Sequence, residues 1–492
     1  MQSSHLKRLL YGLECFALFA CTGNIRVDRN INELPPIFPD YSEVTIPANI
    51  APLHFELTDS CDCSEAYAYF EVDSKSVKVK ASKMQMAIRP SDWKKLMEAA
   101  KGKAVEVKVV VKKGGAWAAY KPFHLFVSQD PVDPYIAYRL IEPVYEKWNE
   151  MGIYQRCIET YKQTPIATNK MNGYNCMNCH SFCMQSPDKM LFHMRKDFGG
   201  TFLIDGDNIE KLNTKTPQTI SPLVYPSWHP SGNFVAFSVN TTKQMFHTTD
   251  RNRTEVFDYE SDVTVYDVKK HEIFTSPLLF SKSTFETFPA FSPDGKTLYY
   301  CSADSVKIPD DYEKVRYSLC AITFDPLTRQ FGNKVDTLYN ARIMGKSVSF
   351  PRVSPDGRFL MCTLFNYGNF SIWHREADLY LVDLSNNRIT ILDALNSKEA
   401  ESYHSWSCNS RWVVFSSRRI GGLYTRPFIA HIDKDGKASK PFLLPQDDVD
   451  SYMRLMKSFN VPEFVKGKIK MSPYRLSQKA RNDKGINVQF RE

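Results

Sequence analysis

The 492-residue sequence has no run of eighteen apolar residues and no excess of glycine or proline. The first absence leaves no candidate for a membrane-spanning helix, and the second excludes collagen-like and low-complexity chains. The sequence also lacks Gly-x-Ser-x-Gly, phosphate-loop and His-Glu-x-x-His motifs, so hydrolase and nucleotide-binding classes have no local support. What it has is a globular composition with 13% aromatic residues, which favours a β-rich protein of two or three domains.

The formal net charge of +8 comes from one stretch of the chain. Residues 75–113 contain twelve Lys or Arg against three acidic residues, so the remainder is nearly balanced. No aromatic residues interleave with these cations in the way that stacked bases require, so nucleic acid is not expected as a partner. We expect a solvated basic face, with anionic lipid or glycan as the alternative contact.

The N-terminus has the form of an export signal. Lys7 and Arg8 precede an apolar stretch at 9–20, which is too short to span a bilayer, and the Leu-Phe-Ala-Cys that ends at Cys21 resembles the bacterial lipoprotein box. This resemblance implies that residues 1–20 are removed and that Cys21 carries lipid; a cleaved but unlipidated signal is the alternative. The expected location is the envelope of a Gram-negative-type bacterium, facing the periplasm rather than the cell surface.

Composition and periodicity divide the rest of the chain into zones. Residues 21–40 are polar with several prolines, which predicts a tether. Residues 41–130 alternate apolar and polar side chains, which predicts a small basic β-sandwich-like domain. Residues 131–172 are expected to form a helical connector, 173–475 the largest domain, and 476–492 a polar basic tail.

Residues 220–440 contain a repeat of strand, tight turn and strand. The copies begin at Tyr225, Phe288, Phe350 and Tyr403, and the fourth keeps the spacing but loses the proline and glycine of the turn. The repeat resembles that of TolB-type and WD-type β-propellers, which implies an all-β fold. A degenerate copy lies near Pro187, and a further blade is expected from the segment after Asp433 combined with strands before residue 170. We therefore predict a six-bladed propeller.

The sequence Cys176-Met-Asn-Cys179-His180 resembles the attachment motif of c-type cytochromes. Two thiols three residues apart can join both vinyl groups of a haem from one short turn, and the adjacent imidazole then lies beneath the iron as an axial ligand. The resemblance implies one covalent haem c. A zinc site, a redox pair and a disulfide are the alternatives, although the first lacks a second ligand pair and the second lacks a βαβ neighbourhood.

The second axial ligand of such a haem can come from anywhere in the fold. The repeat places the motif on the loop that enters the first blade's inner strand, near the channel mouth, and it places His404 at an inner-strand proline position. His193 aligns with the packed second-strand position of Phe237, which favours a core residue, and Met184 is near in sequence. The distal candidates are His404, His193, Met184 or an open site.

The expected function is electron transfer or haem-based sensing in the cell envelope, with redox or scaffold proteins as partners. One alternative is a non-enzymatic scaffold in which Cys176 and Cys179 form a disulfide. Another is a haem peroxidase-like enzyme with an open axial site. Arg418, Arg419 and Arg426 could form an anion or partner site, although exposed arginines at strand ends are expected to be solvated.

Overall fold

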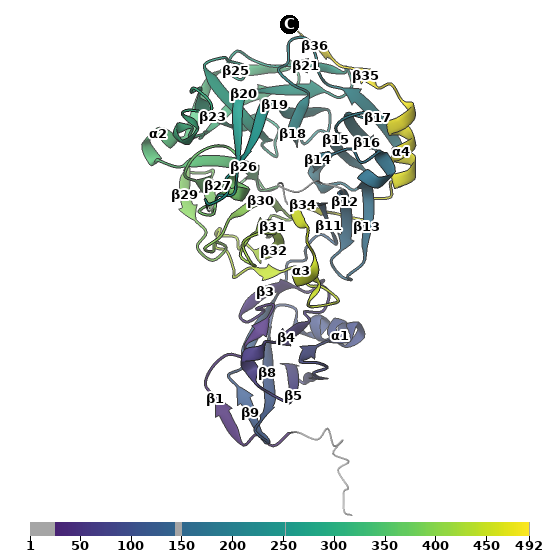
Figure 1. Ribbon diagram of the computed structural model, residues 1–492, viewed down its shortest axis with the longest axis vertical. Coiled ribbons are helices and arrows are strands. Elements are labelled where there is room, and N and C mark those ends of the chain that lie inside the picture. Colours follow the sequence, from purple (N-terminus) through teal and green to yellow (C-terminus); the bar gives the residue numbers. More distant parts are fainter. Residues whose placement is uncertain (1–24, 143–149, 251, 492) are drawn as a thin grey trace, which may run out of the picture.

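The computed structural model describes residues 25–142, 150–250 and 252–491. They form a small β domain and, beside it, a ring of six sheets (Figure 1). The predicted all-β fold and six-bladed propeller are confirmed by the strand pairing. The predicted signal peptide and Cys21 lie outside the described residues, as does the part of the predicted connector at 143–149.

The small domain contains two sheets and one helix around an apolar core. The larger sheet consists of β1 (Arg29–Ile31), β3 (Val44–Pro47), β5 (Glu65–Val72), β6 (Lys75–Lys80), β8 (Ala104–Lys113), β9 (Ala116–Tyr120) and β10 (Phe123–Ser128). The smaller sheet consists of β2 (Ile37–Phe38), β4 (Phe55–Leu57) and β7 (Gln85–Met86), and the helix is α1 (Pro90–Ala100). Alternation along β5 buries every second residue, as its period-two pattern predicts. The predicted tether is wrong in part, because β1 pairs with β9 and β2 pairs with β4.

Each propeller blade has four antiparallel strands, which follow one another from the channel outward. The first three blades are β14 (Met177–Phe182), β15 (Lys189–Met194), β16 (Gly200–Asp205), β17 (Asn208–Asn213); β18 (Leu223–Trp228), β19 (Phe234–Phe246), β20 (Thr254–Asp267), β21 (Glu272–Phe274); and β22 (Thr284–Phe291), β23 (Thr297–Asp304), β24 (Ser318–Asp325), β25 (Gln330–Tyr339). The fourth and fifth are β26 (Ser347–Val353), β27 (Phe359–Phe365), β28 (Asp378–Asp383), β29 (Arg388–Ile391); and β30 (Glu401–Trp406), β31 (Trp412–Ser417), β32 (Arg426–His431), β33 (Phe442–Leu443).

The sixth blade joins distant parts of the chain. Its inner strand is β34 (Ser458–Val465), which pairs with β11 (Tyr135–Ile141), followed by β12 (Gly152–Cys157) and β13 (Gln163–Thr168). Figure 1 shows yellow β34 beside blue β11 where the ring closes. The predicted connector is therefore wrong for the described residues 131–142 and 150–172, since β11 is rich in Tyr and Ile and pairs on both edges.

The C-terminal residues are not a free tail. Helix α4 (Pro473–Asn482) packs on the outer strands of the sixth and first blades, β13 and β17, and β35 (Ile486–Asn487) and β36 (Gln489–Phe490) add parallel strands to the first and second blades. The Lys211 ammonium donates to the backbone oxygens of Ala480 and Asp483. Two short helices, α2 (Ala341–Met344) and α3 (Ser451–Arg454), lie in loops.

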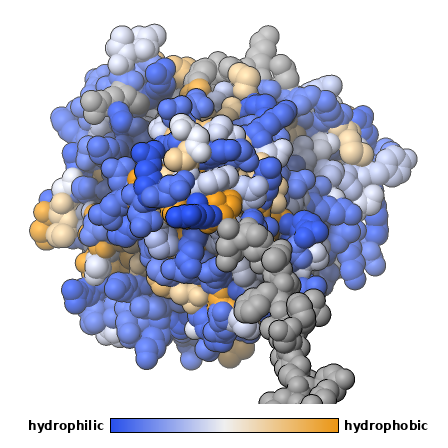
Figure 2. Space-filling model, turned by 90° about the horizontal axis from the view of Figure 1, so that it is seen from below, coloured by the Kyte–Doolittle hydropathy of each residue, from blue (hydrophilic) through white to orange (hydrophobic). Residues whose placement is uncertain are grey.

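The small domain packs against the fifth blade. One apolar cluster contains residues of both, including Trp93 of α1 and Trp412 of β31. The Trp412 indole donates to the Asp130 carbonyl at 3.2 Å, and the Tyr41 hydroxyl donates to the Leu443 carbonyl at 3.3 Å. Viewed from the small-domain side, the surface is mostly hydrophilic with scattered apolar patches (Figure 2). Among residues 25–142, 150–250 and 252–491, every helix is too short or too polar to cross a membrane.

Candidate functional site

The Cys-x-x-Cys-His motif lies on the innermost strand of the first blade. Cys176 immediately precedes β14, and Cys179 and His180 lie within it, at a bulge between Asn178 and Ser181. The predicted place, a loop entering this strand, is therefore wrong for Cys179 and His180. The strand lines the central channel, so the motif faces the middle of the ring rather than its rim (Figure 1).

The bulge is repeated in all six blades. One non-glycine residue of each inner strand has a left-handed backbone with φ near 50°, which L-residues adopt only when the surrounding fold enforces it. These residues are Cys179 (53°), Tyr225 (49°), Phe288 (49°), Phe350 (51°), Tyr403 (53°) and Val461 (50°). The next residue is proline in four blades and histidine in two, His180 and His404. His180 thus occupies the same place in its blade as His404 does in the fifth.

Aromatic side chains at the bulge residues fill the channel beside Cys179. Ring centroids of Tyr225 and Phe288 are 4.7 Å apart, those of Phe288 and Phe350 4.1 Å, and those of Phe350 and Tyr403 4.9 Å. The first and sixth blades contribute the smaller Cys179 and Val461, so the aromatic packing is incomplete on the side of the motif. Burial raises the pKa of Tyr225 and Tyr403, with Cys179 among their electrostatic neighbours.

His180 is the most unusual member of the motif. It is 2% exposed, and within the described part of the chain neither ring nitrogen has a hydrogen-bond partner. Desolvation, assisted by the nearby Arg139 cation, lowers the pKa of His180 to about 3, although the Val461 backbone, which approaches the ring without forming a hydrogen bond of normal geometry, opposes this. The closest carboxylate is that of Glu463, whose Oε1 lies 3.9 Å from Nε2. His180 is therefore a neutral imidazole with two unused nitrogen atoms, which is costly in a buried position.

Both cysteines of the motif are free thiols and half-buried. Burial raises the pKa of the Cys179 thiol, while the Tyr225 backbone and the Arg139 and Arg195 cations partly oppose it. Two thiols, which could form the thioether links, and one neutral imidazole, which could ligate iron, are the residue types that a covalent c-type haem requires. The backbone differs from the single short turn that we predicted, because β14 is extended except at Cys179.

The three distal candidates lie in two places. His404 and Met184 line one cavity at a channel mouth, which has room of about 130 Å³ for water-sized molecules. The His404 Nε2 bonds to the Met361 carbonyl at 2.9 Å, and Met184 is 37% exposed. His193 does not line this cavity; its Nδ1 bonds to the Thr201 hydroxyl at 2.8 Å.

The alignment of His193 with Phe237 is wrong by one residue. Strand register pairs His193 with Asn178 and, in the next blade, Ser238 with Val224, so His193 is equivalent to Ser238. In the first blade Ser181 pairs with Leu191, ten residues later in the chain. In the second blade the equivalent Ser227 pairs with Ala236, only nine residues later. The extra turn residue shifted the sequence alignment, although His193 remains a buried core residue as predicted.

The cavity at this mouth also contains a pair of opposite charges. Arg352 and Glu463 project into it from the fourth and sixth blades. Desolvation raises the pKa of Glu463 to about 7, although the Arg352 cation and the Phe182 N–H, which donates at 3.2 Å, both favour its ionised form. Neither residue was identified from the sequence. Both stand at the same repeat position, two residues after the left-handed residue of their inner strand, and this shared position could have identified them.

The three arginines that we predicted to be solvated are structural. Arg418 and Arg426 are 4% and 3% exposed. The Arg418 Nε donates to the Ile372 carbonyl at 2.7 Å, and Arg426 donates to backbone carbonyls around α3. Arg419 forms an ion pair with Glu401 at 3.1 Å. Since their donors are used within the fold, they do not form an exposed anion site.

In the small domain, four lysines of the basic stretch form ion pairs with nearby carboxylates: Lys80, Lys103, Lys108 and Lys112. Lys108 contacts Glu71 and Glu106 at 2.8 Å each, and Lys103 contacts Asp73 at 2.7 Å. Exposed pairs of this kind contribute little to stability, and they leave a smaller positive field than the sequence count implies.

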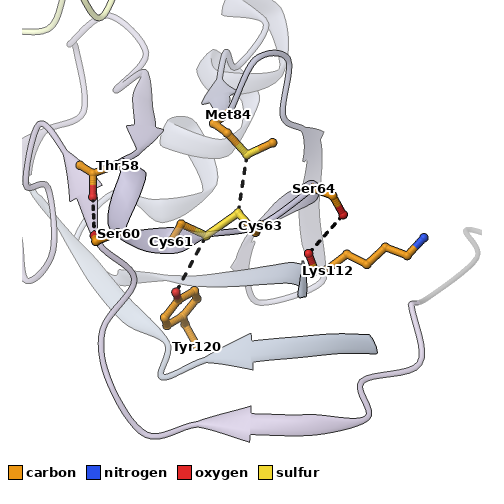
Figure 3. Close-up of a disulfide and its surroundings, with 8 residues drawn as sticks. All are labelled: Thr58, Ser60, Cys61, Cys63, Ser64, Met84, Lys112 and Tyr120. Carbon is orange, nitrogen blue, oxygen red and sulfur yellow. Dashed lines mark hydrogen bonds between the residues drawn. A yellow bond between two sulfur atoms is a disulfide. The ribbon is translucent and has the colours of Figure 1, made fainter. Parts of the chain in front are cut away.

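The domain also contains a disulfide between Cys61 and Cys63, beside Met84 and Tyr120 (Figure 3). The Cys63 sulfur lies 3.6 Å from that of Met84. Among the described residues no cluster of His, Cys, Asp and Glu has the geometry of a metal site.

Comparisons with known proteins give a fold likeness only. No family model matches the sequence, and no curated protein matches it. Among solved structures, TolB from Acinetobacter baumannii is similar over 76% of this chain and 85% of its own, with 14% identity and a TM-score of 0.44. The β-propeller domain of the Trilobed protease from Pyrococcus furiosus is similar over 83% of this chain and 98% of its own, with 14% identity and a TM-score of 0.34. Hydrazine synthase from Kuenenia stuttgartiensis is similar over 54% of this chain and 65% of its own, with 13% identity and a TM-score of 0.32.

Proposed function

We propose that this propeller carries one covalent c-type haem on Cys176, Cys179 and His180, and that it serves electron transfer or haem-based sensing in the cell envelope. The observation that carries the proposal is the state of His180, a buried neutral imidazole whose two nitrogens have no hydrogen-bond partner within the described residues. A buried polar side chain without a partner is rare in proteins, and ligation to a metal centre is one reason for it to persist. Two free thiols in the same motif support this reason.

The surrounding residues determine what such a site could do. A bound haem would supply one-electron chemistry; Cys176 and Cys179 would hold it covalently and His180 would ligate its iron. Desolvation keeps the imidazole unprotonated across the physiological range, which is the form that ligates iron. The channel aromatics beside Cys179 exclude water on one side of the motif.

The direct test is a haem stain after denaturing electrophoresis of protein co-expressed with a cytochrome c maturation system. We expect a stained band for the wild type, and its loss in the double variant Cys176→Ser with Cys179→Ser. Cys183→Ser is the matched control, because Cys183 is a buried thiol outside the motif whose sulfur is 4.0 Å from the His229 carbonyl. An unstained wild type with mature, folded protein would refute the haem.

A haem-free scaffold is the second candidate, and the equivalence of His180 and His404 favours it. His404 occupies the same place without any neighbouring cysteine pair, and prolines occupy it in four blades. In a haem-free scaffold, His180 would only fill space between the first and sixth blades. Thiol counting with a maleimide reagent on denatured protein after reduction separates the two, since reduction makes Cys176 and Cys179 of a scaffold reactive whether they were free or bridged, whereas thioether links resist reduction and keep them inert.

Export and lipid attachment complete the proposal. Residues 1–20 would be removed and Cys21 lipidated, with the protein facing the periplasm and with envelope redox or scaffold proteins as partners. Labelling with a fatty-acid analogue tests this, with Cys21→Ser as the variant expected to lose the label while keeping the propeller.

A further inference from the structure

The second blade has a hairpin that extends beyond its sheet. Strands β19 and β20 have 13 and 14 residues, and their pairing continues from Asn240 with Ser261 to Phe246 with Thr254. The corresponding strands of the third blade, β23 and β24, have eight residues each. The extension packs against the third blade and brings two carboxylates, Glu255 and Asp258, into the interior at 3% and 6% exposure.

Asp258 has no cationic partner among the described residues. Its carboxylate accepts hydrogen bonds from the Asn240 amide at 3.0 and 3.2 Å, from the Tyr317 hydroxyl at 3.0 Å and from the Asn369 amide. All three donors are neutral, so they stabilise the ionised carboxylate without cancelling its charge. Burial raises the pKa of Asp258 to about 6 despite these bonds, as expected for a carboxylate that lacks a counter-ion.

A small cavity lies directly beside this carboxylate. Its room for water-sized molecules is about 20 Å³, enough for one small group. Aromatic rings form much of its wall, with Phe257 and Tyr312 at 4.8 Å between centroids and Tyr312 and Tyr367 at 5.6 Å. Within the described ranges, neither a lysine nor an arginine lines it.

The side chain of Asn369 independently indicates that a hydrogen-bond donor is missing from this cavity. It lines the cavity and is 2% exposed, and its amide oxygen has no hydrogen-bond partner in the described part of the chain. Its amide nitrogen already donates to Asp258, which fixes the orientation of the group. The second carboxylate, Glu255, is already engaged by the Tyr367 hydroxyl at 2.8 Å and by His374 at 3.4 Å. The cavity therefore offers the negative charge of Asp258 and a free acceptor; its described wall holds no lysine or arginine, and the histidine in it, His374, is paired with Glu255 and Glu376.

We propose that this cavity binds the primary ammonium group of a small amine, with Asp258 as its counter-ion. An ammonium group brings the positive charge that Asp258 lacks and three N–H donors, one of which can reach the amide oxygen of Asn369. Aromatic faces attract cations, and the wall of Phe257, Tyr312 and Tyr367 provides them. The limited room selects a primary ammonium over a quaternary one. This site does not depend on the proposed haem, which lies on another blade.

Isothermal titration of the full chain with methylammonium chloride tests the proposal, with sodium chloride at equal ionic strength as the reference. We expect saturable binding of methylammonium and none of tetramethylammonium. Nα-acetyl-lysine amide forms a second arm: tighter binding of this probe than of methylammonium assigns the site to a lysine side chain, and the reverse assigns it to a free amine. Failure of both primary ammonium probes would overturn the proposal.

Variants locate the binding in the cavity. Asp258→Asn should weaken binding at least tenfold, because it keeps the shape and removes the charge. Asp262→Asn is the matched control, since Asp262 is 3% exposed on the same strand, accepts from the Ser281 N–H at 3.0 Å and lies outside the cavity. Tyr312→Leu, at the half-buried wall, should weaken binding severalfold and serves as the second variant if Asp258→Asn does not fold. Unchanged affinity in Tyr312→Leu and in a folded Asp258→Asn would place the binding elsewhere and overturn the proposal.

Discussion

Replacing Glu463 by glutamine should stabilise the protein at alkaline pH and leave it unchanged at acidic pH. Glu463 lies in the channel, and its side chain is 18% exposed. Burial raises its pKa from 4.5 to about 7. Because the folded state holds the proton more tightly than the unfolded chain, its stability falls as the pH rises between these two values.

The magnitude follows from the two pKa values. At about 1.4 kcal/mol per pKa unit, the gap between 4.5 and about 7 corresponds to at most about 3.5 kcal/mol of lost unfolding free energy. The loss is absent below about pH 4.5, where both states are protonated, and complete above about pH 7. Glutamine cannot ionise and keeps an oxygen for the Phe182 N–H, so Glu463→Gln should avoid the loss.

Urea unfolding at about pH 4.5 and about pH 8 measures the difference. We expect the variant and the wild type to agree at the lower pH and the variant to be more stable at the higher pH. Glu98→Gln on the exposed face of α1 is the control and should show no such divergence. Equal free energies of wild type and Glu463→Gln at both values would refute the reasoning, since Glu463 would then ionise as it does in the unfolded chain.

Three further predictions concern stability. In protein made without haem, His180→Pro should be neutral or stabilising by up to about 2 kcal/mol, because it removes two unpaired buried nitrogens at a site where four blades have proline. His404→Pro should instead cost about 1 kcal/mol, since it loses the bond to Met361, and the opposite order in urea unfolding would contradict the equivalence of the two sites. Replacing both Cys61 and Cys63 by alanine should cost only about 1–2 kcal/mol in the same assay, because their disulfide closes a very short loop; a loss above about 4 kcal/mol would show that it organises the domain in another way. A chain that ends before residue 458 should lose the cooperative unfolding of the propeller in calorimetry, because the sixth blade then has no inner strand, and a transition like that of the full chain would contradict this.

The propeller could be predicted from its sequence repeat because the pattern of each copy is local in the sequence. Each copy of strand, turn and strand is complete within about fifteen residues, so the four clear blades and the proline position of His404 could be found without the structure. The sixth blade was also predicted, although the β-strands of 131–172 were taken for a connector. The pairing of β11 with β34, more than 300 residues away in sequence, makes residues 135–141 part of a blade, and no local pattern reveals a pairing over that distance.

The sequence identified Cys176, Cys179 and His180 as candidate site residues, but it did not predict that Cys179 and His180 lie within an inner strand. The motif Cys176 to His180 has no proline and no aromatic residue, so nothing local shows that it replaces the Tyr-Pro or Phe-Pro of other blades. One extra residue in the following turn then displaced the alignment. Arg352 and Glu463 could not be paired from sequence, because they come from the fourth and sixth blades and meet only across the channel.

The sixth blade has a consequence for biogenesis. Because β34 completes a sheet begun by β11, the ring stays open until almost the whole chain has been delivered to the compartment where it folds. Until then β11 has an unpaired inner edge and β14 lacks its contact with β34, although it still packs against β18, so Cys176, Cys179 and His180 are more accessible to macromolecules than in the closed ring. Any enzyme that modifies this motif would therefore act before the last strand is in place, and the order of modification and ring closure would be set by the topology of the chain.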